Sequence, residues 1–599
     1  MDSRWRPRRP VGAEPLEPRR LLSSSFPNIN ISKLLGNQAE GAIAVDRADP
    51  TKLFAVSNID VGDGLMAATS SNSGASWSTK TIANDRDGLP AACCDPSAEF
   101  DSFGNLFLAY LNNSTDSVIV LRSTDAGQDF TLLKEYHGNV DQPTVNVGPG
   151  GVFVEWDSAS GISVAGATDT SLGVTGTFGD AQIVPGSTGG AFGDVAVGPS
   201  GQVMVTYQKD VGNAAKIYVN VDANFLGAAA FGKPIVATTT NVPDFDFIDA
   251  QPNRGIDAEA GLAFDRSGGP FNGRVYLVYT NQTPGTQNTD IFLRYSDTDG
   301  ATWSNPVRVN DDTTLNSQLL PRIALDNTTG KVAVGWYDAR NDLGKGGPGD
   351  TDHIPNDDVE YYATLITPLA NGVEVAPNLQ VSAGASNAED ANSGIDLGDY
   401  TGLDFYNGTI HPEWFDNSNS TGDNPDGTLK DLDVYTANVA ASAFSSGSAI
   451  ALGGRSDPSG LVAALSFANG ANSGVARHVH SYTITVQYSD ASGINLSSVD
   501  GSNLLITGPN GFSANAQFVH VKSKGRTAAM ATYRVTNAVG NFTAAQAGTY
   551  TIQLEPDQVL DSQRNASAGG ILGTFAIATA GTGSHFGGMG NRHHHDDHA

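Results

Sequence analysis

Cysteine is nearly absent from this chain. Its only two cysteines, Cys93 and Cys94, are adjacent in 599 residues. Such scarcity excludes a fold scaffolded by disulfides, and it also excludes a four-cysteine zinc site. Two interpretations of the pair stay open. It is either a vicinal disulfide in an oxidising compartment or two ordinary thiols at the start of a strand.

Basic residues and long apolar runs are also scarce. The 34 lysines and arginines stand against 64 aspartates and glutamates, giving a formal net charge of −30. This balance argues against nucleic acid or an anionic membrane surface as a partner. It is typical of an extracellular protein whose carboxylate-rich loops bind Ca²⁺. No apolar run reaches 18 residues, so we expect no membrane span.

Long helical patterns are lacking as well, whereas glycine is abundant at 69 residues. The remaining pattern is one of short strand-like runs separated by turn residues, which predicts an all-β protein. The chain length allows two to four domains.

One turn motif occurs three times, at 70–77, 123–130 and 296–303. Its pattern is Ser-x-(Asp/Asn/Thr)-x-Gly-x-x-aromatic, and it predicts a hairpin turn in which polar side chains cap the backbone and glycine supplies a positive φ. The motif resembles the Asp-box, or BNR repeat, of sialidase-like β-propellers. This resemblance implies a propeller fold, and it implies that the motif itself lies away from any substrate.

A longer repeat covers residues 37–440. Seven stretches share a polar or small start, alternating apolar residues, a turn and a second apolar strand. They end their first strand at Asp46, Asp101, Gly148, Gly198, Asp265, Asp326 and Tyr406, so they are spaced 47 to 80 residues apart. Hairpins at such spacing are typical of propeller blades. We predict a propeller of six or seven blades, with seven favoured by the repeat.

The two ends of the chain differ from the rest. Residues 1–25 are rich in arginine and proline and lack the apolar core of a signal peptide. The run at 16–22 resembles the LEPR-XLL segment of large bacterial surface proteins, which implies sorting or export. A disordered basic arm is the alternative. Residues 581–599 form a Gly/His-rich tail, either disordered or able to chelate a metal.

A second domain is expected after a linker at 441–458. Alternating residues at 482–488 predict a half-buried strand, and further strands follow up to 577. Residues 459–580 therefore predict a small β-sandwich. The stretch resembles the Ig-like modules of bacterial surface proteins.

Aligning the seven repeats gives two columns of residues at the start of each inner strand. The first column is Glu40, Asp95, Gln142, Phe192, Glu259, Leu320 and Tyr400. The second is Ala42, Ser97, Thr144, Asp194, Gly261, Arg322 and Gly402. Inner strands of a propeller begin at the same end of the ring, so these residues are expected to converge on a central funnel. The alternative is that they cap exposed backbone.

The resemblance to sialidases implies roles for several of these residues. It makes Tyr400 the nucleophile, Glu259 its base and Asp95 the acid/base. Arginines bind a substrate carboxylate through a planar fork. The candidates here are Arg322, Arg254 and Arg340, with Gln142 and Glu40 as further substrate-binding residues. The chain departs from the family because only Arg47 lies in 26–69, where a sialidase has its first arginine.

A polar loop at 338–358 is too rich in glycine, proline and aspartate to form a core. Its candidate metal ligands are Asp350, Asp352, Asp357 and Asp358, and the expected ion is Ca²⁺, the only cofactor we predict. A solvated excursion is the alternative, because the spacing is not that of an EF-hand.

Two functions from different classes follow from the sequence. The favoured one is a secreted or cell-surface bacterial protein whose propeller binds a glycan or a cell-surface protein without catalysis. The alternative is a glycoside hydrolase of the exo-α-sialidase type. The sequence gives no oligomeric state.

Overall fold

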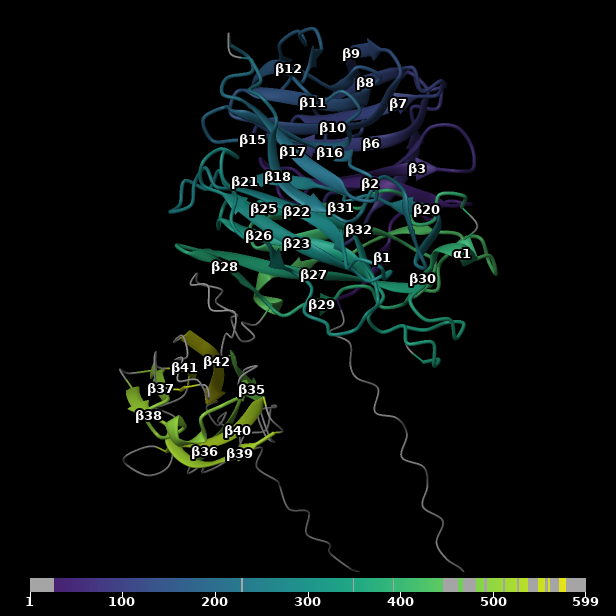
Figure 1. The fold of residues 1–599 in the computed structure, drawn as a ribbon. Coiled ribbons are helices and arrows are strands. Elements are labelled where there is room, and N and C mark those ends of the chain that lie inside the picture. Colours follow the sequence, from purple (N-terminus) through teal and green to yellow (C-terminus); the bar gives the residue numbers. More distant parts are fainter. Residues whose placement is uncertain are drawn as a thin grey trace, which may run out of the picture. The chain divides into compact units, whose positions relative to one another are not determined.

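The computed structural model describes residues 26–227, 230–347, 349–391, 393–444, 462–466, 481–489, 493–509, 512–524, 527–536, 548–554, 559–560 and 570–577. Contacts divide the chain into two units. One comprises Met1–Ala363 with Asn378–Ala440, and the other Thr364–Pro377 with Ala441–Ala599. Figure 1 shows that strands make up nearly all of the regular structure, which confirms the all-β prediction. Helix within the described residues is limited to α1 (Ala388–Ala391), η1 (Ala441–Ala443) and η2 (Leu496–Ser498).

Antiparallel sheets follow one another along residues 29–440, numbered here in chain order. The first contains β2 (Gln38–Val45), β3 (Leu53–Ile59), β4 (Leu65–Ser70) and β5 (Ser78–Ile82). The second contains β6 (Ala92–Phe100), β7 (Leu106–Asn112), β8 (Ser117–Ser123) and β9 (Thr131–His137). The third contains β10 (Val140–Gly148), β11 (Gly151–Ser158), β12 (Gly161–Ser171), β13 (Val174–Thr175) and β14 (Gln182–Ile183). The fourth contains β15 (Ala191–Val197), β16 (Val203–Asp210), β17 (Ala215–Asp222) and β18 (Ile235–Thr240).

Three further sheets complete this series. The fifth contains β21 (Gly261–Phe264), β22 (Val275–Gln282), β23 (Thr289–Ser296) and β24 (Val307–Arg308). The sixth contains β25 (Gln318–Asp326), β26 (Lys331–Asp338), β27 (Asp358–Leu369), β28 (Gly372–Val375), β29 (Leu379–Gln380) and β30 (Ser386–Asn387). The seventh contains β31 (Gly402–Tyr406), β32 (Thr409–Asp416), β33 (Asp433–Thr436), β34 (Val439–Ala440) and β1 (Ile29–Asn30). A separate hairpin, β19 (Asp246–Ile248) and β20 (Gln251–Ile256), lies between the fourth and fifth sheets in the sequence.

The sheets form a closed ring. Their first strands contact one another in the order β2, β6, β10, β15, β21, β25 and β31, and β31 contacts β2 again. A ring of four-stranded antiparallel sheets around a central channel is a β-propeller. The first and last parts of the ring's sequence also close it, because β1 pairs antiparallel with β33 in the last sheet. The predicted start at residue 37 missed this closing strand, which is only two residues long.

The core of the propeller lies between neighbouring sheets. One cluster joins Phe54 and Val56 of β3 to Leu108 and Tyr110 of β7. The second strands are buried on both faces, as in β3 from Leu53 to Asn58. They therefore occur in the sequence as continuous apolar runs rather than as alternating ones.

All three copies of the turn motif join the third strand of a sheet to its fourth. The serine hydroxyl accepts the glycine N–H in each, at 3.0 Å for Ser70 and Gly74 and at 2.9 Å for the equivalent pairs at 123/127 and 296/300. The glycine φ values are 77°, 88° and 77°. The predicted hairpin turn is confirmed, and its position on the outer strands separates it from the channel.

We expect Gly127→Ala to destabilise the propeller more than Gly150→Ala does. Both glycines have positive φ, which costs an alanine about 1–2 kcal/mol. A Cβ at Gly127 would also lie 2.4 Å from the buried ring of Phe54, whereas one at Gly150 meets no atom within 4 Å. Urea unfolding followed by tryptophan fluorescence measures the difference. Equal midpoints for the two variants would contradict the packing argument.

The second unit contains two four-stranded sheets. One has the order β35 (Val462–Ser466), β36 (Ser481–Ser489), β40 (Ala528–Thr536) and β39 (Gln517–Ser523). The other has the order β38 (Phe512–Asn515), β37 (Leu504–Gly508), β41 (Gly548–Leu554) and β42 (Gly570–Ile577). Ile484, Tyr533, Ile506 and Tyr550 belong to one buried cluster shared by both sheets. The likeness to an Ig-like module stays a prediction.

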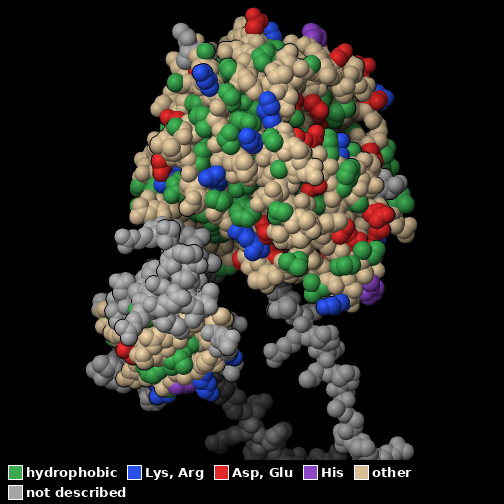
Figure 2. All heavy atoms as spheres, viewed as in Figure 1, with side chains coloured by type: hydrophobic (Ala, Val, Ile, Leu, Met, Phe, Trp, Pro, Cys, Tyr) green, Lys and Arg blue, Asp and Glu red, His purple; other side chains and the backbone are tan. Residues whose placement is uncertain are grey.

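Several predictions fall wholly or partly outside the described residues. They are the LEPR-XLL-like segment at 1–25, the linker from 445 onward and the His-rich tail at 581–599. In the part of the chain that is described, no helix is long and apolar enough to cross a membrane. On the face of the larger unit drawn in Figure 2, acidic and basic side chains are interspersed.

Candidate functional site

The first column of the repeat coincides with an unusual backbone conformation. Six of its seven members have positive φ, namely Glu40 (51°), Asp95 (55°), Gln142 (44°), Phe192 (56°), Glu259 (44°) and Leu320 (51°). In five sheets the pairing of the inner strand with its neighbour shifts at this residue. The column therefore marks a repeated β-bulge, a device that re-aims side chains at the rim of a sheet. The apolar residues Leu320 and Phe192 also occupy this position. The bulge is therefore a feature of the fold and does not by itself indicate a binding site.

A small cavity of about 20 Å³ lies where these strands begin. Four sheets and the segments just before β21 and β31 supply its lining, which consists of Ser97, Gln142, Pro143, Thr144, Phe192, Gly193, Glu259, Arg322 and Tyr400. The structure thus brings together Gln142, Glu259, Arg322 and Tyr400, four residues that the sequence alignment had singled out. We call this space the central cavity.

Arg322 donates a hydrogen bond to the Glu259 carboxyl group in the wall of the central cavity. Arg322 Nη1 lies 3.2 Å from Glu259 Oε1, and its Nε donates to the backbone carbonyl of Thr401 at 2.9 Å. Burial raises the pKa of Glu259 to about 8, although Arg322 opposes the rise, while Asp399 adds to it. Glu259 is therefore a carboxylic acid that holds its proton at neutral pH.

Tyr400 lies beneath the same arginine. The Arg322 guanidinium carbon is 5.4 Å from the centre of the Tyr400 ring. Burial, followed by the charges of Asp95 and Glu40, raises the pKa of the Tyr400 hydroxyl well above its usual value. The environment therefore disfavours a tyrosinate, the reactive form that a nucleophilic role would need.

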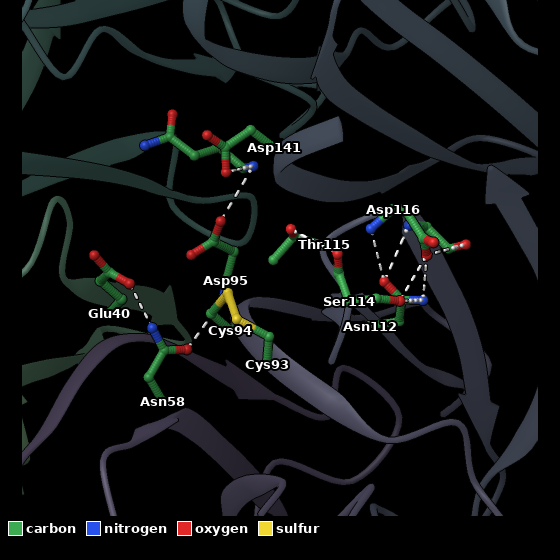
Figure 3. The surroundings of a disulfide bond; sticks show 12 residues. Glu40, Asn58, Cys93, Cys94, Asp95, Asn112, Ser114, Thr115, Asp116 and Asp141 are labelled. Atoms are coloured by element: carbon green, nitrogen blue, oxygen red, sulfur yellow. Dashed lines mark hydrogen bonds between the residues drawn. A yellow bond between two sulfur atoms is a disulfide. The ribbon is translucent and has the colours of Figure 1, made fainter. Parts of the chain in front are cut away.

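Glu40 and Asp95 belong to a closed circuit of hydrogen bonds beside the central cavity, part of which Figure 3 shows. Asn58 donates from Nδ2 to Glu40, and its Oδ1 accepts the Asp95 N–H at 3.0 Å. Gln142 N donates to Asp95 Oδ2 at 3.2 Å, and Gln142 Nε2 to Asp399 Oδ2 at 3.3 Å. Asp399 N closes the circuit by donating to Glu40 Oε1 at 3.3 Å. Burial and then Asp399 raise the pKa of Glu40 to about 7.

Asp399 is a member of this site that the sequence alignment missed. Arg254 Nε donates to Asp399 Oδ1 at 2.7 Å, and Arg254 Nη2 bonds the other carboxylate oxygen. Arg254 comes from β20, the hairpin outside the repeat, and its guanidinium carbon lies 4.7 Å from the ring centre of Phe245. Arg254 therefore contacts Asp399 in a bidentate manner, which fixes the orientation of the carboxyl group. The alignment of repeats could not have found the contact between Arg254 and Asp399, because the β19–β20 hairpin lies outside the repeat.

Arg340 is not brought to the central cavity. Its guanidinium donates to Asp338 Oδ2 and to Asp311 Oδ1, each at 2.7 Å, and to Asn378 Oδ1 at 2.9 Å. Arg340 follows β26, whose last residue, Asp338, is one of its partners. The three candidate arginines therefore do not gather, and the two that do lie near the cavity are each paired with a carboxylate.

A second charged cluster lies toward the opposite ends of the inner strands. Arg47 Nη2 is 2.6 Å from Asp404 Oδ1 and 3.7 Å from Glu99 Oε1. Burial raises the pKa of Glu99 to about 7, against the opposing effect of Arg47. Arg47 stood out in the sequence only as the single arginine of residues 26–69, since nothing local links it to Asp404.

Cys93 and Cys94 form a disulfide, which decides between the two interpretations of the pair. The bond immediately precedes Asp95 in β6, as Figure 3 shows. Both half-cystines lie in the stretch of β6 where its pairing with β7 shifts.

Among the predicted metal ligands, Asp350, Asp352 and Asp357 lie in the loop between β26 and β27, and Asp358 begins β27. Carboxylate oxygens of Asp352, Asp357 and Asp358 lie within 4.8 Å of one another. Asp350 belongs to a second such group with Asp342 and Asp358. The structure thus brings all four predicted residues together and adds Asp342.

No family model and no curated protein matches this sequence. Solved structures of similar fold include an α-L-arabinofuranosidase of Fusarium graminearum, 11% identical over 51% of this chain and 88% of that one, with a TM-score of 0.33. Another is the leech intramolecular trans-sialidase, 11% identical over 68% and 69% of the two chains, with a TM-score of 0.35. A third is the Hadza microbial sialidase Hz136, 14% identical over 50% and 63%, with a TM-score of 0.32. These are glycoside-processing propellers, and likeness at this level concerns the fold alone.

Proposed function

We propose that the protein is an exo-acting glycoside hydrolase that cleaves a terminal sugar at the central cavity. The observation that carries the proposal is Glu259, a largely buried carboxylic acid with a pKa raised to about 8, in the wall of that cavity. A raised pKa at a cavity wall is typical of a general acid. The free space of about 20 Å³ holds only water-sized groups, so most of a bound sugar would lie at the mouth of the cavity.

Glu259 and Asp399 are the acid and base of the proposed reaction. Glu259 would donate its proton to the glycosidic oxygen as the bond to the leaving group breaks. Asp399, oriented by Arg254, would accept a proton from the attacking water or attack the sugar itself. This assignment replaces the tyrosine mechanism of the sialidase resemblance, because Tyr400 is held in its protonated form.

A neutral sugar suits the central cavity better than a sialic acid does. Arg322 and Arg254 are the arginines near the cavity, and each already pairs with a carboxylate. A substrate carboxylate would have to displace Glu259 or Asp399. The substrates to test first are therefore neutral pentosides and hexosides, with a sialoside beside them.

The test compares wild type with Glu259→Gln on glycosides whose leaving groups are good (4-nitrophenyl) or poor (an alkyl alcohol). Loss of a general acid typically lowers turnover by about 10²–10⁴-fold. We expect the loss to be much larger for the poor leaving group, because only that group needs the proton. The matched control is Asp169→Asn, another buried carboxyl with a pKa near 7, on β12 away from the central cavity.

Wild-type inactivity on every glycoside would refute the hydrolase proposal. Turnover that Glu259→Gln leaves unchanged would refute the role of Glu259. Turnover of the sialoside alone would restore the sialidase-type alternative.

The pH dependence of turnover is a second prediction. Because Glu259 must be protonated, kcat/KM should fall above a pH near 8. Arg322 favours the ionised form, so Arg322→Met should move this alkaline limb to higher pH as well as weaken binding. Stopped assays between pH 5 and 10 measure the limb. If Arg322→Met moved this fall in kcat/KM to lower pH, the assignment of Glu259 as the acid would be contradicted.

The second candidate function is glycan binding without catalysis. It is favoured by the closed circuit through Glu40, Asp95 and Asp399, whose polar atoms are largely used within the protein. Binding on a glycan array with no turnover would support it. We also propose an extracellular or cell-surface location, since the Cys93–Cys94 disulfide suits an oxidising compartment.

A further inference from the structure

Five carboxylates gather where β26 passes into β27. They are Asp342, Asp350, Asp352, Asp357 and Asp358. Oxygens of Asp342, Asp350 and Asp358 lie within 4.8 Å of one another, and so do oxygens of Asp352, Asp357 and Asp358. Asp358 belongs to both groups, so the two form one continuous cluster. We call it the β26–β27 cluster.

The carboxyl groups of this cluster lie close together without a cationic partner. Four of its members are buried, and only Asp352 is exposed. Among the residues that the structure describes, no lysine, arginine or histidine forms an ion pair with any of the five. Backbone groups supply hydrogen bonds instead, as where Asp342 Oδ2 accepts the N–H groups of Asp357 at 2.8 Å and Asp358 at 3.0 Å. Such donors orient carboxylates but cancel little of their charge.

One oxygen in the cluster has no hydrogen-bond donor at all. Asp357 is 8% exposed, and its buried Oδ1 has no hydrogen-bond partner in the described structure. The neighbouring Glu360 is 3% exposed, and its Oε2 also has no hydrogen-bond partner in the described structure. A buried acceptor without a donor costs free energy unless a water or an ion satisfies it.

We propose that the β26–β27 cluster is a Ca²⁺ site. Calcium takes six to eight oxygen ligands at about 2.3–2.6 Å, so oxygens less than 4.8 Å apart can share one ion. Mg²⁺ suits the cluster less well, because it demands near-ideal octahedral geometry and keeps much of its water. The bound ion stabilises the conformation of the loop between β26 and β27. This role is independent of the proposed hydrolase activity.

The test uses the full-length protein treated with EDTA, then titrated with Ca²⁺ or Mg²⁺. Isothermal titration calorimetry measures binding, and differential scanning fluorimetry measures Tm. We expect Ca²⁺ to bind at least tenfold more tightly than Mg²⁺ and to raise Tm further with each increase in concentration.

Asp357→Asn separates a metal site from a merely structural cluster. Its Oδ1 accepts no hydrogen bond, and its removal relieves like-charge repulsion. In EDTA we therefore expect the variant to be as stable as wild type or more so. In Ca²⁺ we expect at least a tenfold loss of affinity and a smaller rise in Tm. The control is Asp423→Asn in the loop between β32 and β33, where Asp423 pairs with exposed Lys33.

The remaining outcomes overturn the proposal. One is a wild-type protein that neither binds Ca²⁺ at millimolar concentration nor gains Tm. Another is an Asp357→Asn protein less stable in EDTA with an unchanged calcium response. A third is an Asp423→Asn protein that loses calcium affinity as strongly as Asp357→Asn.

Discussion

The propeller is expected to lose stability steadily as the pH rises from about 5.5 to 8.5. Three glutamates of the inner strands and their entries, one buried and two partly exposed, have raised pKa values in the folded protein, about 7 for Glu40, about 7 for Glu99 and about 8 for Glu259. The ordinary value is 4.5. Burial is the largest cause in each case, because it disfavours the charged form.

The sign of the effect follows from proton binding. Between pH 4.5 and the raised pKa, the folded protein holds a proton on each glutamate that the unfolded chain has already lost. Stability therefore falls as pH rises through this window and levels off above it. A rise of two pKa units in one group amounts to roughly 3 kcal/mol.

The charged groups around each glutamate are part of this expectation. Glu259 faces Arg322, Asp399, Asp194 and Glu40. Glu99 faces Arg47, Asp404, Arg266 and Asp194. Around both glutamates the arginines reduce the rise in pKa without cancelling it, because burial has the larger effect.

Thermal unfolding in EDTA, followed by tryptophan fluorescence, measures this effect in the propeller. All five tryptophans in the described residues lie in the larger unit. We expect Tm to fall by roughly 5–10 °C across the window. Glu259→Gln should give a shallower slope, because it removes one titrating group. A Tm that stays constant or rises between pH 5.5 and 8.5 would show that these glutamates are ionised in the folded protein.

The site was predictable from sequence as far as it repeats. Glu259 and Tyr400 could be aligned because each lies two residues before an inner strand, at the position that Glu40 and Asp95 occupy in their own repeats. Because the ring closes, residues at the same position of different repeats lie close together in space. The same argument found Gln142 and Arg322, although it could not find their partners.

The unpredicted contacts are those that no repeat encodes. Arg254 and Asp399 lie 145 residues apart, and one of them comes from an inserted hairpin. Arg340 looked equivalent to the other arginines by residue type, but its position after β26 directs it to Asp338. Sequence spacing reports on backbone register, whereas such pairs depend on where side chains of different sheets meet.

Arg47 gives the other large expected effect. It follows β2 in the first sheet, whereas Asp404 lies in β31 of the seventh, so their ion pair spans the junction where the ring closes. Asp404 is buried, and its Oδ2 also accepts the Val45 N–H at 2.7 Å. Arg47→Met would leave the charges of Asp404 and Glu99 without their nearest cation.

We expect Arg47→Met to lower the free energy of unfolding of the propeller by about 3 kcal/mol, the low end for breaking a buried ion pair. The low end applies because Arg47 Nη1 is itself buried without an acceptor in the described structure, so its removal also relieves a cost. Asp404→Asn added to Arg47→Met should restore part of the loss, since the amide carries no charge. Lys33→Met, which breaks the exposed pair with Asp423, should change stability by less than about 1 kcal/mol. Urea midpoints from tryptophan fluorescence compare the four proteins. An Arg47→Met protein as stable as Lys33→Met would mean that the junction is held by backbone pairing and apolar packing alone.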